Sequence, residues 1–469
     1  MTLPPAPDLA AAATALLLLA LGARVALREP RPFWWLTVFL APLAVGWRVR
    51  FGVEVTVPFE PMLVLSGLSL VRARVRPEGG WTPFLRHPVF LAAAASVGWM
   101  AASSATALDP VAGLKATAIR ALYAAVLLGG GVVFLRPEGA VRRLAVGVSV
   151  SLLPVALFTL GAYAAVGFGR RAAYEIAQPF FSNRLDLLAA LTVWGVVGGL
   201  LLRSRDGPGL SRGEAFVVKA FVALTLILFV TLFARSALVG VLAAFGALPL
   251  LGGRSSPGRV VALLATGLAV TATGGALFVS ARSARLGPEP VRGFFSPVVD
   301  AVVALGPLKD ASVLERANRW SAAARMVADR PLSGFGPNGF ERAYAPWQRV
   351  TETTSDSSFT GGRGDAHSEY AAAAAEQGLV GLGLLLILLG SLVAAGVRAA
   401  RGAASPEGRT AAVAFTAGLV AFAAMNLFNS FLDLDKVAPS FWLVSAGIVA
   451  CDRARVSGAA AAPTTPEDC

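Results

Sequence analysis

Long apolar runs, broken by short connections that carry arginine, dominate this sequence from end to end. A helix of about 20 apolar residues spans a bilayer's hydrocarbon core, because each residue adds about 1.5 Å toward a thickness of about 30 Å. The sequence therefore predicts an all-α fold, a polytopic membrane helix bundle of about 12–13 transmembrane helices. The runs lie at roughly Leu9–Ala23, Phe33–Trp47, Val53–Val71, Val89–Leu108, Val111–Leu135, Leu144–Phe168, Leu187–Leu202, Ala215–Phe233, Ser236–Leu251, Val260–Ala281, Leu379–Val397, Thr410–Phe431 and Val437–Ala450.

The charge balance agrees with a membrane protein. Charged residues make up 15% of the 469 residues, against about a quarter in soluble domains, which excludes an ordinary soluble domain and a disordered chain. The net charge of +13 arises mainly from arginines in alternate connections, which the positive-inside rule places in the cytoplasm. We therefore expect no nucleic-acid partner. The two cysteines and two histidines of the chain predict neither a disulfide framework nor a His-rich metal centre.

One long polar interval divides the chain. We expect N-terminal membrane helices over residues 1–281, a structured periplasmic loop over 282–366, C-terminal membrane helices over 367–452, and a disordered cytoplasmic tail over 453–469. A loop this long is usually functional. It contains an amphipathic helix pattern in which Ser312 and Glu315 form a capping box and Pro331 ends the helix.

His367 lies where this loop meets the next apolar helix. The positive end of the helix dipole favours a neutral imidazole there, and a neutral imidazole can accept a proton from an incoming hydroxyl. Asp365 or Glu369 could orient the ring. The alternative is an interfacial histidine that only caps the helix or binds solvent, and spacing alone leaves both open.

Arg316 and Arg319 lie one turn apart on the predicted loop helix, so their guanidinium groups share a face. Two such forks suit a diphosphate, because arginine binds phosphate oxygens bidentately and keeps its charge. The alternative is a solvated face with Glu315 and Asp310 as partners.

Arg235 stands between two apolar runs with almost no polar linker. A charge this close to hydrocarbon is a functional candidate by default, and snorkelling to the outer headgroups is the alternative. Three further cations in or near the runs, Lys115, Arg120 and Lys219, are expected to have structural roles, and His87 no special role.

The sequence contains no P-loop, no dinucleotide fingerprint and no metal-ligand cluster. We therefore expect chemistry without a cofactor or a bound metal, with arginines as the cationic partners.

Taken together, these residues resemble the family of bacterial O-antigen ligases and polymerases. Two departures from the family pattern are Ser368, where asparagine is frequent, and Ala234, where serine is frequent. The motifs that carry the resemblance are Arg316-Ala-Asn-Arg319-Trp320, Pro331-Leu-Ser-Gly334-Phe-Gly336, His367-Ser-Glu369-Tyr370, Glu376-Gln-Gly378-Leu-Val-Gly381, Ala234-Arg235-Ser236-Ala237 and Phe181-Ser-Asn183-Arg-Leu-Asp186.

The resemblance implies a membrane glycosyltransferase of the bacterial inner membrane with its active site facing the periplasm. Its donor would be a glycan on undecaprenyl diphosphate, and its acceptor a hydroxyl of the lipid A–core. The expected catalytic residues are His367, Arg316 and Arg235, and the reaction is expected to invert the anomeric carbon. The expected substrate-binding residues are Arg319, Trp320, Glu369 and Asp365.

Three alternatives to a ligase stay open. A repeat polymerase of the same family would use another lipid-linked glycan as acceptor, and a third branch of the family would use a protein Ser or Thr. A non-enzymatic transporter of lipid-linked glycan is more distant, because such proteins tend to have two related halves and broken helices, and the sequence suggests neither.

Overall fold

The structure is a computed structural model that describes residues 20–48, 54–72, 85–135, 139–168, 173–203, 210–232, 234–252, 311–348 and 364–460. The expected span Val260–Ala281 and most of Leu9–Ala23 lie outside these residues. The helices are α2 (Pro30–Leu40), α3 (Phe59–Arg72), α5 (Pro88–Ser104), α6 (Pro110–Tyr123) with the π-turn η2 (Ala124–Gly129) and α7 (Gly130–Phe134), α8 (Ala140–Ala165), α9 (Arg184–Leu202), α10 (Arg212–Leu232), α11 (Arg235–Gly252), α14 (Ala311–Asp329), α15 (Phe340–Ala343), α16 (Glu369–Arg401), α17 (Pro406–Met425) and α18 (Ala438–Ala460). Two strands, β1 (Val45–Arg48) and β2 (Glu54–Val57), form a hairpin.

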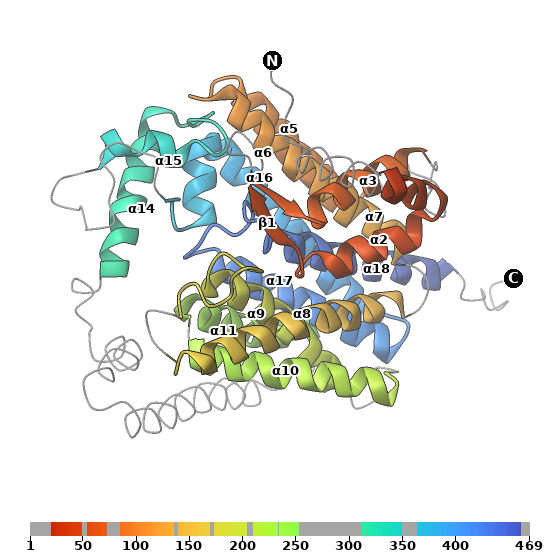
Figure 1. The fold of residues 1–469 in the computed structure, drawn as a ribbon. Helices are drawn as coiled ribbons and strands as arrows, with labels where there is room; N and C mark the ends of the chain where they lie inside the picture. Colours follow the sequence, from red (N-terminus) through yellow and green to blue (C-terminus); the bar gives the residue numbers. More distant parts are fainter. Residues whose placement is uncertain are drawn as a thin grey trace, which may run out of the picture.

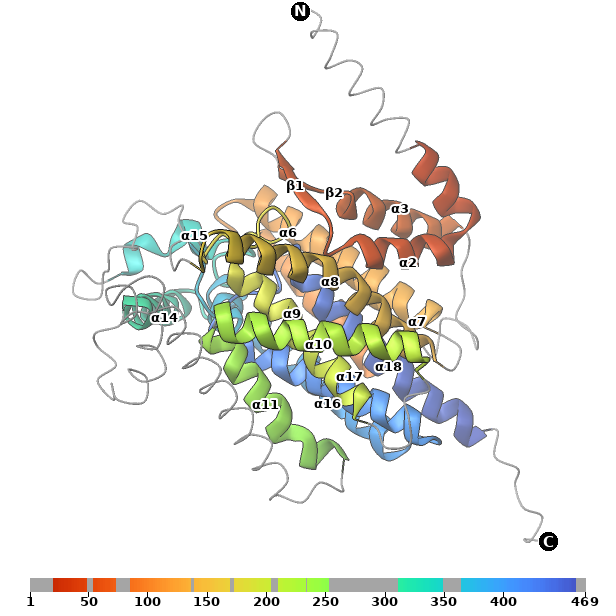
Figure 2. The same cartoon turned by 60° about the horizontal axis from the view of Figure 1, so that its bottom comes forward.

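The described helices confirm an all-α polytopic membrane bundle. Six of them are long and apolar enough to cross a bilayer when α6, η2 and α7 are taken as one, and α5 and α11 are shorter apolar helices. Figures 1 and 2 show the apolar helices packed side by side, with α14 and α15 at one end and the last turns of α18 at the other.

The hairpin corrects the expected spans Phe33–Trp47 and Val53–Val71. Helix α2 ends at Leu40 and α3 starts at Phe59, so Val45–Trp47 and Val55–Val57 form strands, with Val45 paired to Val57. The alternation of β-branched valines with other residues favours this pairing. The hydroxyl of Thr56, on the face toward the bundle, donates to Asp435 Oδ2 at 3.5 Å.

Helix α17 is also shorter than the expected run Thr410–Phe431. It ends at Met425, and the side chain of Asn426 makes hydrogen bonds to the backbone where the next helical turn would have made them. Its amide donates to the carbonyl of Phe422, and its Oδ1 accepts the N–H of Phe431 at 3.0 Å. A short asparagine side chain that binds nearby backbone groups commonly ends a helix in this way.

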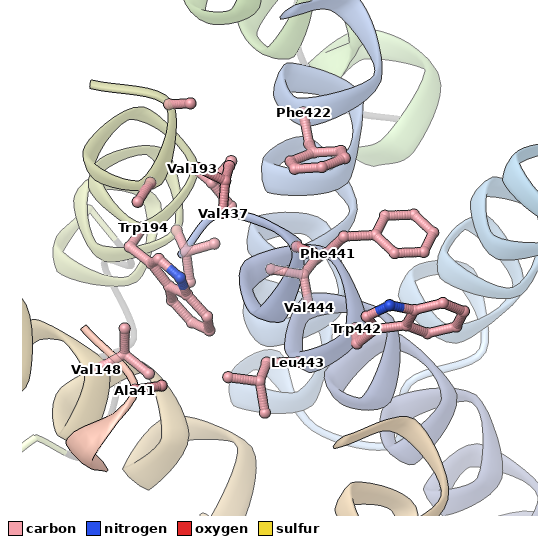
Figure 3. Close-up of a cluster of buried hydrophobic side chains, with 14 of the residues drawn as sticks. Ala41, Val148, Val193, Trp194, Phe422, Val437, Phe441, Trp442, Leu443 and Val444 are labelled. Atoms are coloured by element: carbon pink, nitrogen blue, oxygen red, sulfur yellow. The ribbon is translucent and has the colours of Figure 1, made fainter. Parts of the chain in front are cut away.

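The core lies where α9, α17 and α18 meet. Trp194 of α9 and Leu443 of α18 converge there with Ala41, the residue after α2, and Val148 of α8 (Figure 3). The indole N–H of Trp194 donates to Ser440 Oγ at 3.1 Å, which satisfies its buried polar atom. Glycines bring the helices close together, since a Cβ on Gly418 would meet Val197 of α9.

The end of the bundle away from α14 is held by the Asp452 carboxylate. It accepts from Arg398 at 2.7 Å, and from His87 and Arg455 at 3.3 Å each. His87, for which no special role was expected, therefore links α5 to α18. The same contacts support the continuation of α18 to Ala460, so the expected disordered tail starts too early at residue 453.

Candidate functional site

The loop helix α14 packs on the first turns of α16. Its apolar side buries Ala323 and Met326 against Ala372 and Ala375. The predicted capping box is wrong, because α14 already begins at Ala311 and Ser312 lies inside it. The predicted end of the helix before Pro331 is confirmed.

A break in α16 receives the turn that follows α14. Gly378 has a φ of 70°, outside the helical region, so the backbone groups around it need other partners. The loop supplies them. Leu379 N–H donates to Pro331 O at 2.7 Å, Phe335 N–H to Ala375 O at 3.0 Å, and Gly336 N–H to Glu376 O at 2.7 Å. The Gly-rich turn thus docks on the break by backbone hydrogen bonds.

The carboxylate of Glu376 completes this docking. Its two oxygens accept the N–H groups of Asn338 at 2.9 Å and Phe340 at 3.0 Å. In the sequence, Glu376 and Gly378 stand out only as part of the family pattern. The only signal of the break in the sequence is a glycine, Gly378, inside an otherwise apolar helix pattern.

His367 lies two residues before α16, outside the helix, in the left-handed region with a φ of 50°. Its Nδ1 is 2.8 Å from Asp365 Oδ1, and its backbone N–H donates to the same oxygen at 3.1 Å. In the neutral ring this contact puts the hydrogen on Nδ1 and the lone pair on Nε2. His367 therefore has the tautomer that a general base requires.

Asp365 is fixed as an anion by this arrangement. Burial opposes ionisation of its carboxyl, but the hydrogen bonds from the side chain and backbone of His367 outweigh burial and lower the pKa of Asp365. Asp365 thus contacts the imidazole and orients it, as one of the two expected orienting residues.

Arg319 does not face the outside. Its side chain is buried, with Nε 2.6 Å from Glu315 Oε1 and Nη1 donating to Asp365 O at 2.8 Å, and the guanidinium lies 4.9 Å from the ring centre of Tyr344. The expected direct substrate contact is therefore not supported. Arg319 instead supports the turn that carries His367, with Glu315 as a buried partner.

Arg316 and Trp320 stay at the surface and meet one residue, Phe428. The Nε of Arg316 donates to Phe428 O at 3.4 Å, and the ring centres of Trp320 and Phe428 are 6.2 Å apart. Arg316 is partly exposed and Trp320 is 37% exposed. Of the two loop arginines, Arg316 is the one placed to reach a ligand.

Glu369 differs from its expected role. It is 3% exposed, and its carboxylate contacts other residues. Oε1 lies 3.5 Å from Arg120 Nη2 and Oε2 accepts Leu432 N–H at 3.1 Å, so a substrate contact is not supported. Arg120 also pairs with Asp433. The sequence predicts a structural role for Arg120, but its pairing with Glu369 and Asp433 follows from no local pattern.

Arg235 is exposed at the first position of α11. One and a half turns further along, a Cβ on Gly240 would touch Met425, the last residue of α17. Arg235 therefore lies at the end of the bundle where the segment after Met425 holds Arg316. The structure brings the three expected catalytic residues to this one end.

Asn183 and Asp186 join the same end of the bundle from α9. Asn183 caps the helix by accepting the N–H groups of Leu185 and Asp186, and its amide donates to Asp186 Oδ2 at 2.9 Å. Asp186 lies close enough to Asp365 for the two charges to interact.

The site thus combines an imidazole with a free lone pair, a partly exposed guanidinium on a helix, a second exposed guanidinium, and an aromatic surface. Within the residues that the structure describes, no group of three or more His, Cys, Asp or Glu side chains is arranged to hold a metal ion.

Residues 220–386, rather more than a third of the chain, match the family described as O-antigen ligase. No curated protein matches the chain. The matched stretch contains all seven expected site residues and the break at Gly378, but neither Arg120 nor the segment after Met425. The match confirms the family resemblance: residues 220–386 of this membrane protein are similar to the O-antigen ligase family.

Proposed function

We propose that this protein is a membrane glycosyltransferase that moves a glycan from undecaprenyl diphosphate to an acceptor hydroxyl. The acceptor in this proposal is a sugar of the lipid A–core, the reaction takes place at the periplasmic face of the inner membrane, and nucleic acid has no part in it. One observation carries the proposal. Within a domain of the O-antigen ligase family, His367 has its basic nitrogen free and Arg316 lies at the same end of the bundle.

In the proposed reaction, Nε2 of His367 accepts the proton of the acceptor hydroxyl. The acceptor oxygen forms a bond to the anomeric carbon while the bond from that carbon to the diphosphate oxygen breaks. The bonding electrons leave on the diphosphate, and the guanidinium groups of Arg316 and Arg235 stabilise this charge. Attack from the face opposite the leaving group inverts the anomeric carbon.

Trp320 and Phe428 give the proposal a place for the sugar. Aromatic faces stack well on the apolar sides of sugar rings, and Arg316 binds the backbone carbonyl of Phe428, whose ring lies 6.2 Å from that of Trp320. Asp365 holds the imidazole from behind.

The proposed step uses arginine in place of a metal, and the diphosphate bond supplies the driving force without a cofactor. We expect a chelator such as EDTA to leave transfer unchanged, because permanent guanidinium charges stabilise the leaving group. The measurement is the initial transfer rate with and without EDTA. A rate lost with EDTA and restored by Mg²⁺ would contradict it.

Transfer by the purified protein tests the whole proposal. The full chain in lipid nanodiscs is given a defined undecaprenyl-diphosphate-linked glycan, with lipid A–core, a second lipid-linked glycan or a Ser/Thr peptide as acceptor. We expect a product only with lipid A–core. Absence of transfer to all three acceptors would overturn the proposal.

The repeat polymerase is the second candidate, because the same family match supports it. A gene deletion separates the two. Loss of a ligase leaves free polymer that is not attached to lipid A, whereas loss of a polymerase leaves lipopolysaccharide with a single repeat.

The transporter alternative needs one correction. Broken helices were not expected, yet α16 is broken at Gly378. Loop backbone fills this break through the hydrogen bonds of Pro331, Phe335 and Gly336, so these backbone groups are occupied by the protein itself. Movement of lipid-linked glycan across vesicles without its transfer would favour a transporter.

A further inference from the structure

Arg120 is a buried cation that the proposed reaction does not use. It lies in α6 inside an apolar run and is 8% exposed. Removing a guanidinium from water is costly unless anions compensate it. Its position therefore needs the two carboxylates that it pairs with, those of Glu369 and Asp433.

Both carboxylates belong to segments that build the site. Glu369 is the first residue of α16 and follows His367 by two positions. Asp433 lies in the segment between α17 and α18, five residues after Phe428, which accepts the hydrogen bond of Arg316. Arg120 thus links the segment that carries the imidazole to the segment that holds the arginine.

The two segments are also joined by backbone hydrogen bonds around Glu369. Its N–H donates to Asn426 O and Asn429 O at 3.0 Å each, and its Oε2 accepts Leu432 N–H at 3.1 Å. Arg120 binds the other carboxylate oxygen of Glu369, Oε1, at 3.5 Å, so both oxygens of Glu369 have partners.

We propose that Arg120 is a positioning residue of the transfer reaction, holding Glu369 and Asp433 so that His367 and Arg316 keep their relative positions. This inference rests on the proposed function. Arg120 acts from inside the bundle through its two carboxylate partners, and it does not contact the donor diphosphate.

The test is a double-mutant cycle on the full chain in nanodiscs, with Arg120→Met, Glu369→Gln and the double variant. We expect Arg120→Met to lower kcat on the order of a hundredfold, the effect of a misplaced catalytic group, while KM for the lipid-linked donor stays within about threefold. The double variant removes the guanidinium together with its Glu369 partner and so leaves no unpaired charge at Glu369. Its kcat should therefore be about tenfold higher than that of Arg120→Met.

Two further variants keep the test decisive. Arg120→Lys retains the charge but loses the two-pronged guanidinium that binds both carboxylates. It should fold even if Arg120→Met does not, and its kcat should be about tenfold below that of the wild type. Lys219→Met removes another cation from a membrane helix, on α10, and should keep the wild-type kcat.

Three results would overturn the inference. The first is a wild-type kcat in Arg120→Met or, if that variant does not fold, in Arg120→Lys. The second is a rise in the KM for the donor that accounts for the lost transfer activity, which would make Arg120 a direct ligand of the diphosphate. The third is a double variant whose kcat is no higher than that of Arg120→Met. A wild-type protein that transfers nothing would instead reject the proposed function, and with it this inference.

Discussion

At the scale of single residues, the backbone at His367 determines which substitution is informative. Its φ of 50° strains alanine, whereas asparagine adopts this region more readily. We expect His367→Asn to keep the fold and to lower the transfer rate by about a hundredfold or more, because the proton acceptor is gone. Expression and thermal unfolding are the controls. A near-normal rate in a folded His367→Asn protein would remove His367 from the chemistry.

Asp365 makes a prediction about pH. Its pKa is lowered, so its contact with His367 is complete above the ordinary value of about 4 and is lost only as the pH falls through the lowered pKa. We expect Asp365→Asn to lower kcat on the order of a hundredfold, because the imidazole loses the carboxylate that fixes its orientation and tautomer. The measurement is kcat for both proteins at neutral pH, with thermal unfolding as the control. A wild-type kcat in folded Asp365→Asn protein would contradict the orienting role of Asp365.

At the scale of elements, the docking of the loop on α16 depends on Gly378. A Cβ there would meet the backbone of Leu332 and Pro331, and its φ of 70° is unfavourable for alanine. We expect Gly378→Ala to release the docked turn, lower the melting temperature, and make the chain more sensitive to trypsin at Arg330 and Arg342. The checks are a fluorescence melting curve and timed proteolysis.

Gly383 offers a matched control on the same helix. A Cβ at this position meets nothing within 4 Å, so Gly383→Ala should leave melting and proteolysis unchanged or slightly improved. Equal behaviour of the two alanine variants would show that the break in α16 is not needed for docking.

At the scale of the whole molecule, charge predicts orientation. The end held by Asp452 carries arginines from several connections, and the positive-inside rule places that end in the cytoplasm. In a chain with Cys451 and Cys469 replaced by alanine, Ala317→Cys on α14 should react with an impermeant maleimide in intact cells. Ala404→Cys, exposed at the opposite end, should react only after lysis. The reverse pattern would place the site in the cytoplasm.

Much of the fold could be predicted from sequence, because each membrane helix must form its backbone hydrogen bonds within itself and must be long and apolar enough to cross the bilayer. The spans Leu187–Leu202 and Ala215–Phe233 therefore agree with α9 and α10 within a few residues. The predictions failed where a strand pair or a side-chain hydrogen bond ends a helix inside an apolar run. The alternating valines of the hairpin and Asn426 end runs whose composition alone suggests a longer span.

Local pattern was enough to predict the membrane bundle, the loop helix up to Asp329, and a family motif set that includes His367 and Arg316. Tertiary structure alone decided which of these groups face outward. Arg319 and Glu369 have the same chemistry as their accessible neighbours, yet packing buries both. The contacts of Arg120 with Glu369 and Asp433 join positions 249 and 313 residues apart. Local pattern cannot encode such pairs, because the helices that bring them together choose their neighbours by shape and by the need to compensate buried charge.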